Sequence, residues 1–348
     1  MYQWTFLFLA VIIAAVLLLP FSVKRVEEEL EAFLLVMGAA AMTVSGAWSW
    51  HITAEALKEP LPIAGAVLAA GLIFAALRPR MERLTEKCAA SLGTRMTLFV
   101  LIAAAGLAAS AITAIVAALL FCELLWHLKL DRSTSLRASI YACYAIGLGA
   151  ALTPLGEPLS TIITSKLRGA PHNAGFFWLA GLLAYWVIPA ILAAAAMAAF
   201  WKKPSQAKPG ETAAETAAET PRSIGLRALK VYVFIAALVL LGEGLRPLAE
   251  AIIPKLGDWQ LYLLGLSSAA LDNATLASAG IVPAMSRGQI LSFALSLLVS
   301  GGMLIPGNIP NIITASKLGI RSKEWARTAI PPGILLLGVY FALIRLLR

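Results

Sequence analysis

A stretch that occurs twice constrains the fold of this 348-residue chain more than any other feature. Residues 149–167 read GAALTPLGEPLSTIITSKL and residues 301–318 read GGMLIPGNIPNIITASKL, and the two align when one residue is deleted. Each copy places prolines, glycine and small polar residues in the middle of an apolar segment. Proline lacks a backbone N–H and clashes with the preceding turn, so a regular helix cannot run unbroken through such a segment. The repeat therefore predicts two helices that are broken at matching positions.

The chain around these breaks has the composition of a polytopic membrane protein. Apolar residues form 60% of the chain and charged residues 14%, against about 45–50% and about 25% in soluble domains. Several apolar runs approach the roughly 20 residues that a helix needs to cross a bilayer. The net charge of +9 would suit nucleic acid, but the basic residues lie in short segments between apolar runs, which is typical of membrane topology. We expect an all-α membrane protein that contacts the lipid bilayer and no nucleic acid.

Motifs of catalysis and of cofactor binding are absent from the sequence. No Walker-type phosphate loop, HExxH motif or GxSxG motif occurs. The three cysteines, Cys88, Cys122 and Cys143, lack the spacing of metal ligands and are expected to be small apolar packing residues. We expect no enzyme activity, no resident cofactor and no metal beyond a transported Na⁺.

Shifts in composition divide the chain into four parts. In order, we predict an N-terminal two-helix segment, a first repeat, a cytoplasmic linker and a second repeat, at residues 1–60, 61–200, 201–228 and 229–348. The linker is charged, contains the run ETAAETAAET, and cannot bury enough apolar surface to fold by itself.

Each repeat is predicted to contain a span, a re-entrant hairpin, a broken helix and a final span. The hairpins are expected at 96–128 and 258–286, and the broken helices at 135–167 and 288–318. Arms of about 13 residues rise only about 20 Å, short of the roughly 30 Å hydrocarbon core, although one long tilted helix is the alternative for the first hairpin. Because a hairpin returns to its own side, each half crosses three times and the halves are antiparallel, which is the inverted-repeat plan of many secondary transporters.

The basic residues support this topology of about eight transmembrane helices plus two re-entrant hairpins. Most of the 28 Lys and Arg residues fall in expected loops that the topology places on one side: 21–31, 78–95, 128–137, 201–230 and 317–327. The positive-inside rule makes that side cytoplasmic. We therefore expect a multi-pass protein of the cell (inner) membrane with both termini outside.

Asp272 is the first candidate for function, because ionisable residues inside membrane segments are costly. It is the only charged residue between 259 and 286 and lies at the expected tip of the second hairpin, in LDNATLASA. Its carboxylate, the Asn273 amide and the Thr275 hydroxyl offer the hard oxygen ligands that a small cation prefers. A carboxylate there can also carry a proton. A purely structural N-cap is the alternative.

Glu157 is the only charged residue between 138 and 165 and lies in the first break, in TPLGEPLST. The matching position in the second break is Asn308. A carboxylate at one of two breaks favours a cation or a proton as the ligand. Glu157 could instead cap the second half-helix, and the asparagines could satisfy backbone groups. The remaining candidates at the two breaks are Thr153, Gly156, Ser160, Thr161, Gly307, Asn311 and Thr314.

The tip of the first hairpin carries no charge. Ser110 and Thr113 match the second tip in spacing, although hydroxyls in membrane helices often bond back to the backbone. Glu123 is expected at the membrane interface, near aromatic and basic residues. Glu243 and Arg246, at i and i+3, are expected to form a structural ion pair.

At these motifs the chain resembles the ion transporter superfamily, which includes arsenite, citrate and dicarboxylate carriers and D-type sodium/proton antiporters. Those proteins pair a small-polar hairpin tip with a later G-x-P-P-N-like break in each half, as SAIT with TPLGEPLST and LDNAT with PGNIPNIIT do here. More closely, VEEELEAFLLVMG, LLGEGLRP and IPGNIPNIITASKL are similar to the family of predicted cation transporters.

This resemblance implies a scaffold domain and a mobile transport domain, a homodimer, and alternating access to one midplane site built from tips and breaks. The first tip holds Ala111-Ile112 where the dicarboxylate branch has an Asn-Thr pair, which favours the sodium/proton side. We expect a secondary active cation (sodium)/proton antiporter in which Asp272 and Glu157 bind cation and proton in competition. A sodium- or proton-coupled carrier of an oxyanion or carboxylate is the second hypothesis, and a non-transporting membrane scaffold is the third.

Overall fold

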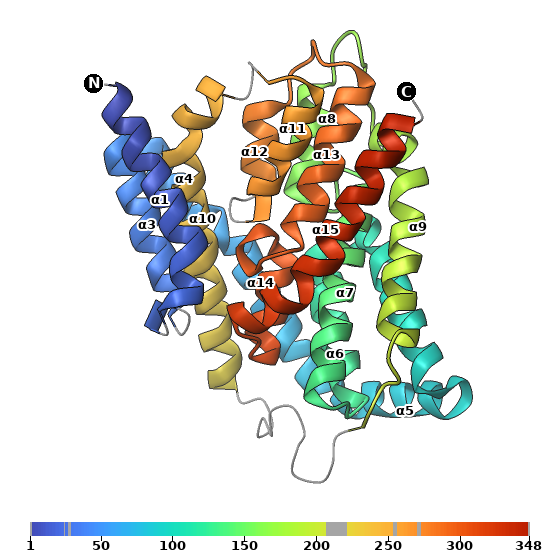
Figure 1. Ribbon diagram of the computed structural model, residues 1–348. Helices are drawn as coiled ribbons and strands as arrows, with labels where there is room; N and C mark the ends of the chain where they lie inside the picture. The colour runs from blue at the N-terminus through green and yellow to red at the C-terminus, as the bar shows by residue number, and fades with distance from the viewer. Residues whose placement is uncertain are drawn as a thin grey trace.

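The computed structural model describes residues 2–23, 25–26, 29–206, 221–252, 256–269 and 273–346, and these residues fold into helices joined by short connections (Figure 1). Within these ranges five stretches of helix are long and apolar enough to cross a membrane: Trp50–Ile73, Lys87–Ile112, Trp178–Phe200, Pro221–Leu248 and Ser322–Leu346. Shorter apolar helices cover Trp4–Pro20, Leu30–Ser45 and Ala114–His127. The chain is an all-α membrane protein, as predicted.

Four helices and the first arm of a fifth form one body of the molecule, which we call the scaffold and which lies at the left of Figure 1. Its elements are α1 (Tyr2–Ser22), α3 (Leu30–Ser45), α4 (Trp50–Lys58), the beginning of α5 (Pro60–Ile112) and α10 (Pro221–Ile252). Glycines bring α3 and α10 together: a Cβ on Gly38 would lie 2.9 Å from the Ala237 carbonyl oxygen, and one on Gly244 would lie 2.6 Å from Ala41 Cβ. Small residues of this kind let membrane helices pack closely.

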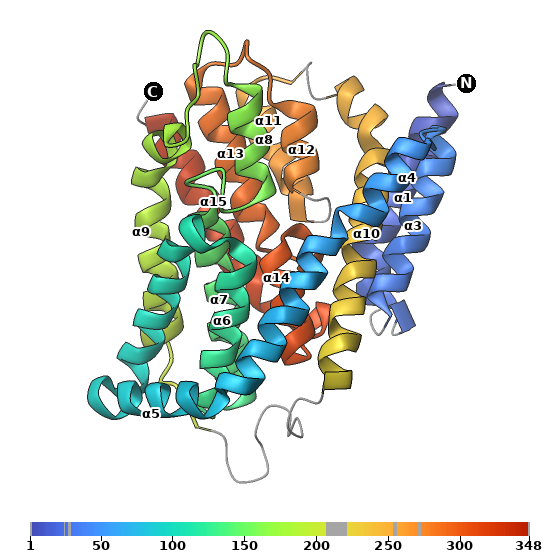
Figure 2. The ribbon, with the colours of Figure 1, turned by 180° about the vertical axis from the view of Figure 1, so that it is seen from behind.

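Helix α5 corrects one prediction. The sequence predicts a loop at 78–95, but this basic segment is helical and runs across the lower end of the molecule between the two arms of α5 (Figure 2). The segment is rich in Arg, Glu, Leu and Lys, which are good helix formers, so charge alone does not make it a loop. The backbone leaves helical geometry at Gly93 (φ 73°, ψ 157°), where glycine adopts a positive φ without strain.

The rest of the described chain forms a second body, which we call the core. In the first half, the last arm of α5 and α6 (Ala114–His127) form a hairpin, and α7 (Arg132–Ala150), α8 (Pro158–Lys166) and α9 (Trp178–Phe200) follow. In the second half, α11 (Asp258–Leu264), η2 (Gly265–Ala269) and α12 (Asn273–Gly280) precede α13 (Arg287–Gly301), η3 (Ile305–Gly307), α14 (Ile309–Leu318) and α15 (Ser322–Leu346). Both helices carrying the repeated motif are broken where the motif predicts.

The two hairpins enter the core from opposite ends and the breaks lie between them at mid-height (Figures 1 and 2). The second arm of each hairpin packs on the second half-helix of the other repeat: α6 contacts α14, and α12 contacts α8. The repeats are therefore interlocked, and each break is surrounded by elements of both halves.

Glycine and proline lie at the ends of α3 and α10. α3 stops at Ser45, because Gly46 adopts the left-handed conformation (φ 68°) that ends helices. α10 already begins at Pro221, inside the predicted linker, and proline is favoured at a first helical position. α15 begins at Ser322 and continues through Pro331 and Pro332.

The connections at the lower end of Figure 1 are the ones that the sequence identifies as basic. They follow α1, α6 and α9, join α14 to α15, and include the transverse part of α5. The first and last described residues lie at the other end. The charged segments therefore gather on one face, as the predicted topology requires.

Candidate functional site

The first break is a short unwound stretch between the end of α7 and the start of α8. A Cβ on Gly156 would overlap the carbonyl of Ala150, so only glycine allows the chain to fold back so closely here. Ser160, in the first turn of α8, donates to the carbonyl oxygens of Thr153 (2.7 Å) and Glu157 (2.8 Å). The serine thus ties the second half-helix to the unwound backbone.

Glu157 is buried at the start of α8. It occupies the N-cap position with extended backbone (φ −157°, ψ 162°), and its side chain makes no capping hydrogen bond. The residue is only 6% exposed. The alternative that the carboxylate serves as a helix cap is therefore wrong. A charged carboxylate at this position is stabilised by the positive end of the helix dipole.

The first hairpin turns at Thr113, within the predicted tip. Thr113 has φ 71°, a rare conformation for a non-glycine residue, and its Oγ1 accepts a hydrogen bond from Val116 N at 3.4 Å. The Ser110 hydroxyl donates back to the Leu107 carbonyl at 3.2 Å. Both hydroxyls thus contact their own backbone.

This tip closes against the first break. Thr153 Oγ1 donates to the Ser110 carbonyl at 2.5 Å, and the Ala114 amide donates to the Gly156 carbonyl at 2.9 Å. The structure therefore brings together the candidate residues of the first tip and the first break. Both of these hydrogen bonds are accepted by backbone carbonyls.

The second break has the same local geometry with different side chains. Asn308 is the N-cap residue of α14 (φ −157°, ψ 145°), and its side chain also makes no capping hydrogen bond. Asn311 Nδ2 donates to the carbonyls of Gly301 and Leu304, both at 2.8 Å. Asn311 therefore plays the structural part that a serine plays in the first break.

Three buried polar atoms around Gly301 have no hydrogen-bond partner among the described residues: Asn273 Nδ2, Ser300 Oγ and Asn311 Oδ1. Their residues are 3%, 0% and 0% exposed. Asn273 Nδ2 lies 3.6 Å from where a Cβ on Gly301 would be, while Asn311 donates to the Gly301 carbonyl, so both amides meet at this glycine. Leaving a buried polar atom unsatisfied costs about 1–3 kcal/mol, so this cluster is suited to a ligand that supplies the missing interaction.

The remaining predicted residues are placed differently. Asn308 faces α7 of the first repeat, where a Cβ on Gly147 would lie 2.5 Å from its Nδ2. Thr314 turns to the thiols of Cys122 (3.5 Å) and Cys143 (3.3 Å), and so packs α14 against α6 and α7. Thr161 is exposed and donates to the Pro154 carbonyl at 2.5 Å, while Gly307 packs its backbone on Gly301 O and Ser268 O. Asp272 and the Thr275 side chain lie outside the described residues.

A cavity of about 480 Å³ between scaffold and core reaches the breaks. Its lining includes Pro158, Ala274 and Ile309, which lie at the N-terminal ends of α8, α12 and α14. On the scaffold side it is lined by four charged residues, Glu55 of α4, Glu59 directly after α4, and Glu243 and Arg246 of α10. The sequence offers no signal that these residues share a cavity with the breaks, since they come from distant segments.

A second cavity, of about 310 Å³, approaches the second break near the lower end of the molecule. Ile305 of η3 lines it, together with Arg321 and with Glu31 and Lys230, whose charged atoms lie 3.6 Å apart. Cavities therefore lie on both sides of the break region, and the upper one has more carboxylates.

Residues 6–347 match a family model described as "Protein of unknown function (DUF1646)". The chain belongs to this family. No curated protein matches it. The function of this DUF1646 protein must therefore be argued from its site.

The DUF1646 chain also contains a buried ion pair that corrects the prediction for Glu123. Lys317 Nζ lies 2.6 Å from Glu123 Oε2, and the two side chains are 5% and 9% exposed. His127 Nε2 lies 3.7 Å from the other carboxylate oxygen. Glu123 is not interfacial, because α14 from the second repeat covers this face of α6.

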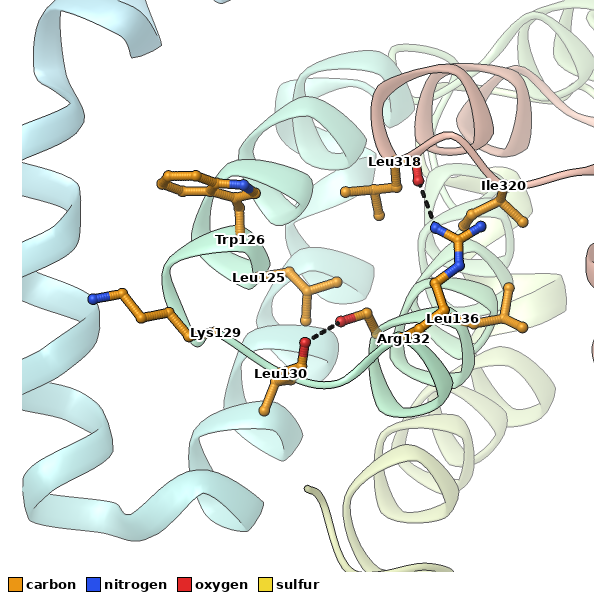
Figure 3. Close-up of a pocket in the computed structure, with 9 residues that line it drawn as sticks. Leu125, Trp126, Lys129, Leu130, Arg132, Leu136, Leu318 and Ile320 are labelled. Atoms are coloured by element: carbon orange, nitrogen blue, oxygen red, sulfur yellow. Dashed lines mark hydrogen bonds between the residues drawn. The ribbon is translucent and has the colours of Figure 1, made fainter. Parts of the chain in front are cut away.

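Arg132 caps the C-terminal end of α14 in this family member (Figure 3). Arg132 donates to the carbonyls of Leu318 and Gly319, both at 2.9 Å, and pairs with Glu324 at 2.8 Å. These bonds satisfy carbonyls that a helix C-terminus leaves without partners. The adjoining cavity, of about 30 Å³, has room for a water molecule and no larger ligand.

Proposed function

We propose that this protein is a secondary active transporter that exchanges a small monovalent cation, Na⁺ in the first place, for protons. The observation that carries the proposal is a pair of helix breaks beside one cavity, with buried Glu157 at the first break and the buried Asn273 and Asn311 amides at the second. Broken helices at matching positions of inverted repeats are the usual location of transporter binding sites.

The ligands at the second break support a cation. Asn311 Oδ1 and Ser300 Oγ are oxygen acceptors, and a half-turn of the Asn273 amide would present a third. The carboxyl ends of α7 and α13 also point toward the breaks, and helix C-termini carry partial negative charge. Hard oxygen ligands without sulfur or imidazole suit Na⁺.

Glu157 and Asp272 are the residues that we assign to the proton. In this proposal each carboxylate binds either the cation or a proton, so that loading with one releases the other. The core would move against the scaffold to present the site to the upper and lower cavities in turn. The positive-inside rule places the lower end in the cytoplasm and both termini outside the cell (inner) membrane, and we propose a homodimer.

Transport in inside-out vesicles tests this function. A pH-sensitive dye inside the vesicles would report proton movement when NaCl, LiCl or KCl is added. We expect Glu157→Gln and Asp272→Asn each to reduce cation-dependent proton movement by roughly 100-fold, or about 2.7 kcal/mol. Glu29→Gln, at an exposed carboxylate before α3, is the matched control. Unchanged proton movement in both site variants would refute the proposal.

An anion carrier is the second candidate, because one observation favours it. Arg246 lines the same cavity as the N-terminal ends of α8, α12 and α14, and helix N-termini attract anions. Uptake of radiolabelled oxyanions and short carboxylic acids under an imposed Na⁺ or proton gradient separates the two. Saturable uptake of an anion would replace the antiporter by the carrier.

A further inference from the structure

The motif LLGEGLRP contributes an ion pair to the upper cavity. Arg246 Nη1 lies 3.2 Å from Glu243 Oε2, as the i, i+3 spacing predicts. The side chains are 54% and 28% exposed, and both residues line the cavity that reaches the breaks. The pair is therefore in contact with the space through which a ligand would approach the site.

The glycine inside the motif explains why the pair faces this way. Gly244 is one of the points at which α10 packs closely on α3, since a Cβ there would lie 2.6 Å from Ala41 Cβ. Successive residues of a helix are rotated by roughly 100°, so Glu243 and Arg246 lie on faces turned away from this contact. The tight packing at Gly244 thus holds the charged face of α10 toward Pro158 and Ile309 across the cavity.

The chemistry of the pair suits exchange with a mobile ion. A solvent-exposed ion pair is worth about 0–1 kcal/mol, so it opens at little cost. Glu55, also in the cavity lining, is 3.3 Å from His51 Nδ1, and Glu59 lies one turn further along the chain. With three carboxylates and one guanidinium, the scaffold wall of the cavity favours cations.

We propose that Glu243 is a specificity-determining residue that takes the cation on its way to the breaks, and that Arg246 is a tethered competitor for the same carboxylate. This inference rests on the proposed function. When the cavity lacks the cation, the guanidinium neutralises Glu243; an arriving cation displaces it and is bound weakly. Weak binding is what allows an ion to leave again toward the deeper site.

We expect substitutions of Glu243 and Arg246 to change the apparent KM for Na⁺ in opposite directions in the vesicle assay. Glu243→Gln removes the carboxylate and should raise KM about fivefold, the upper range for an exposed pair. Arg246→Gln removes the competitor and should lower KM about fivefold, with a slower maximal rate because release is slower. Arg222→Gln, exposed on the same helix and outside both cavities, should leave KM unchanged.

A structural ion pair would behave differently. Both variants would then lower the melting temperature in detergent and leave KM unchanged, which would refute the inference while the wild-type activity upholds the transporter. A rise in the KM for an anion in Arg246→Gln would show that Arg246 binds anions, and would also refute it. A wild-type protein without cation-dependent proton movement would refute the proposed function itself. Na⁺ titration of the intrinsic tryptophan fluorescence, repeated with both variants in detergent, checks the same affinities without transport.

Discussion

The two breaks have the same backbone and different chemistry. Glu157 and Asn308 are N-cap residues with nearly identical φ and ψ, and neither side chain caps its helix. In each break a side chain one turn later, Ser160 or Asn311, holds the unwound carbonyls. The repeat therefore conserves the geometry of an open helix end, while one copy carries a carboxylate and the other a cluster of amides.

The same contrast appears at the lower ends of the half-helices. The repeat aligns Lys166 of α8 with Lys317 of α14. Lys317 is buried against Glu123, whereas Lys166 is exposed. Identical residues at matching positions thus have different environments, because α6 covers α14 and brings the Glu123 carboxylate to Lys317.

The largest expected loss of stability comes from substituting the glycines at which the chain folds back in each break. Gly156→Ala would drive a Cβ into the Ala150 carbonyl, whereas Gly307→Ala would meet Gly301 O at 2.5 Å and Ser268 O at 2.8 Å. We expect a loss of more than about 4 kcal/mol for the first and about 1–3 kcal/mol for the second in the free energy of unfolding. Urea unfolding in detergent micelles measures both.

Gly181→Ala is the control for these two variants, since no atom lies within 4 Å of a Cβ at this position of α9. It should be neutral or stabilising by up to about 1 kcal/mol. Equal losses at Gly156 and Gly307 would contradict the view that the first break is the tighter one.

Lys317→Met should cause the next largest loss in the free energy of unfolding. Removing one partner of a buried ion pair costs about 3–5 kcal/mol, and this variant leaves the buried Glu123 carboxylate without its lysine partner. The double variant Glu123→Leu with Lys317→Met should recover most of this loss. Chemical unfolding of the two single variants and the double variant gives the coupling energy, and a double variant as unstable as the single ones would show that packing, and not charge, is responsible.

Asn311 and Ser160, which donate to the carbonyls of the two breaks, should contribute unequally to the free energy of unfolding. Asn311→Ala removes the side-chain donor to the buried carbonyls of Gly301 and Leu304 and should cost about 2–4 kcal/mol, although Leu304 O still accepts from Gly307 N at 3.3 Å. Ser160→Ala loses one shared hydroxyl proton and should cost about 1–2 kcal/mol. Only Asn311→Ala should also abolish stabilisation of the protein by Na⁺, measured as the shift in melting temperature against choline chloride. Na⁺ stabilisation that survives this substitution would remove Asn311 from the cation site.

The smallest effect is expected for Lys166→Met. Lys166 is exposed, and the ion pairs of exposed lysines are worth about 0–1 kcal/mol. Comparison of its unfolding midpoint with that of Lys317→Met measures how unequal the two repeats are. A loss above about 2 kcal/mol would mean that Lys166 is as deeply involved in packing as its counterpart.

The sequence predicted the parts of the fold that depend on local chemistry. The prolines and glycines of the repeated motif broke both helices where expected, and the basic segments gathered on one face. The positive segment 78–95 was misread as a loop, because charge reports the side of the membrane and not the secondary structure. Of the residues that the sequence predicts for the site, Asn273 and Asn311 lie close to Gly301, and Thr314 contacts the thiols of Cys122 and Cys143.

The sequence by itself determined where the chain must open, since proline and glycine act on their own backbone and need no distant partner. Only the tertiary structure decided what surrounds each opening. It buried Glu123 against Lys317, oriented the Asn311 amide, and placed Glu243 and Arg246 on the cavity of the breaks. These relations join residues that are far apart in the chain, so they depend on how whole helices pack and leave no local pattern to read.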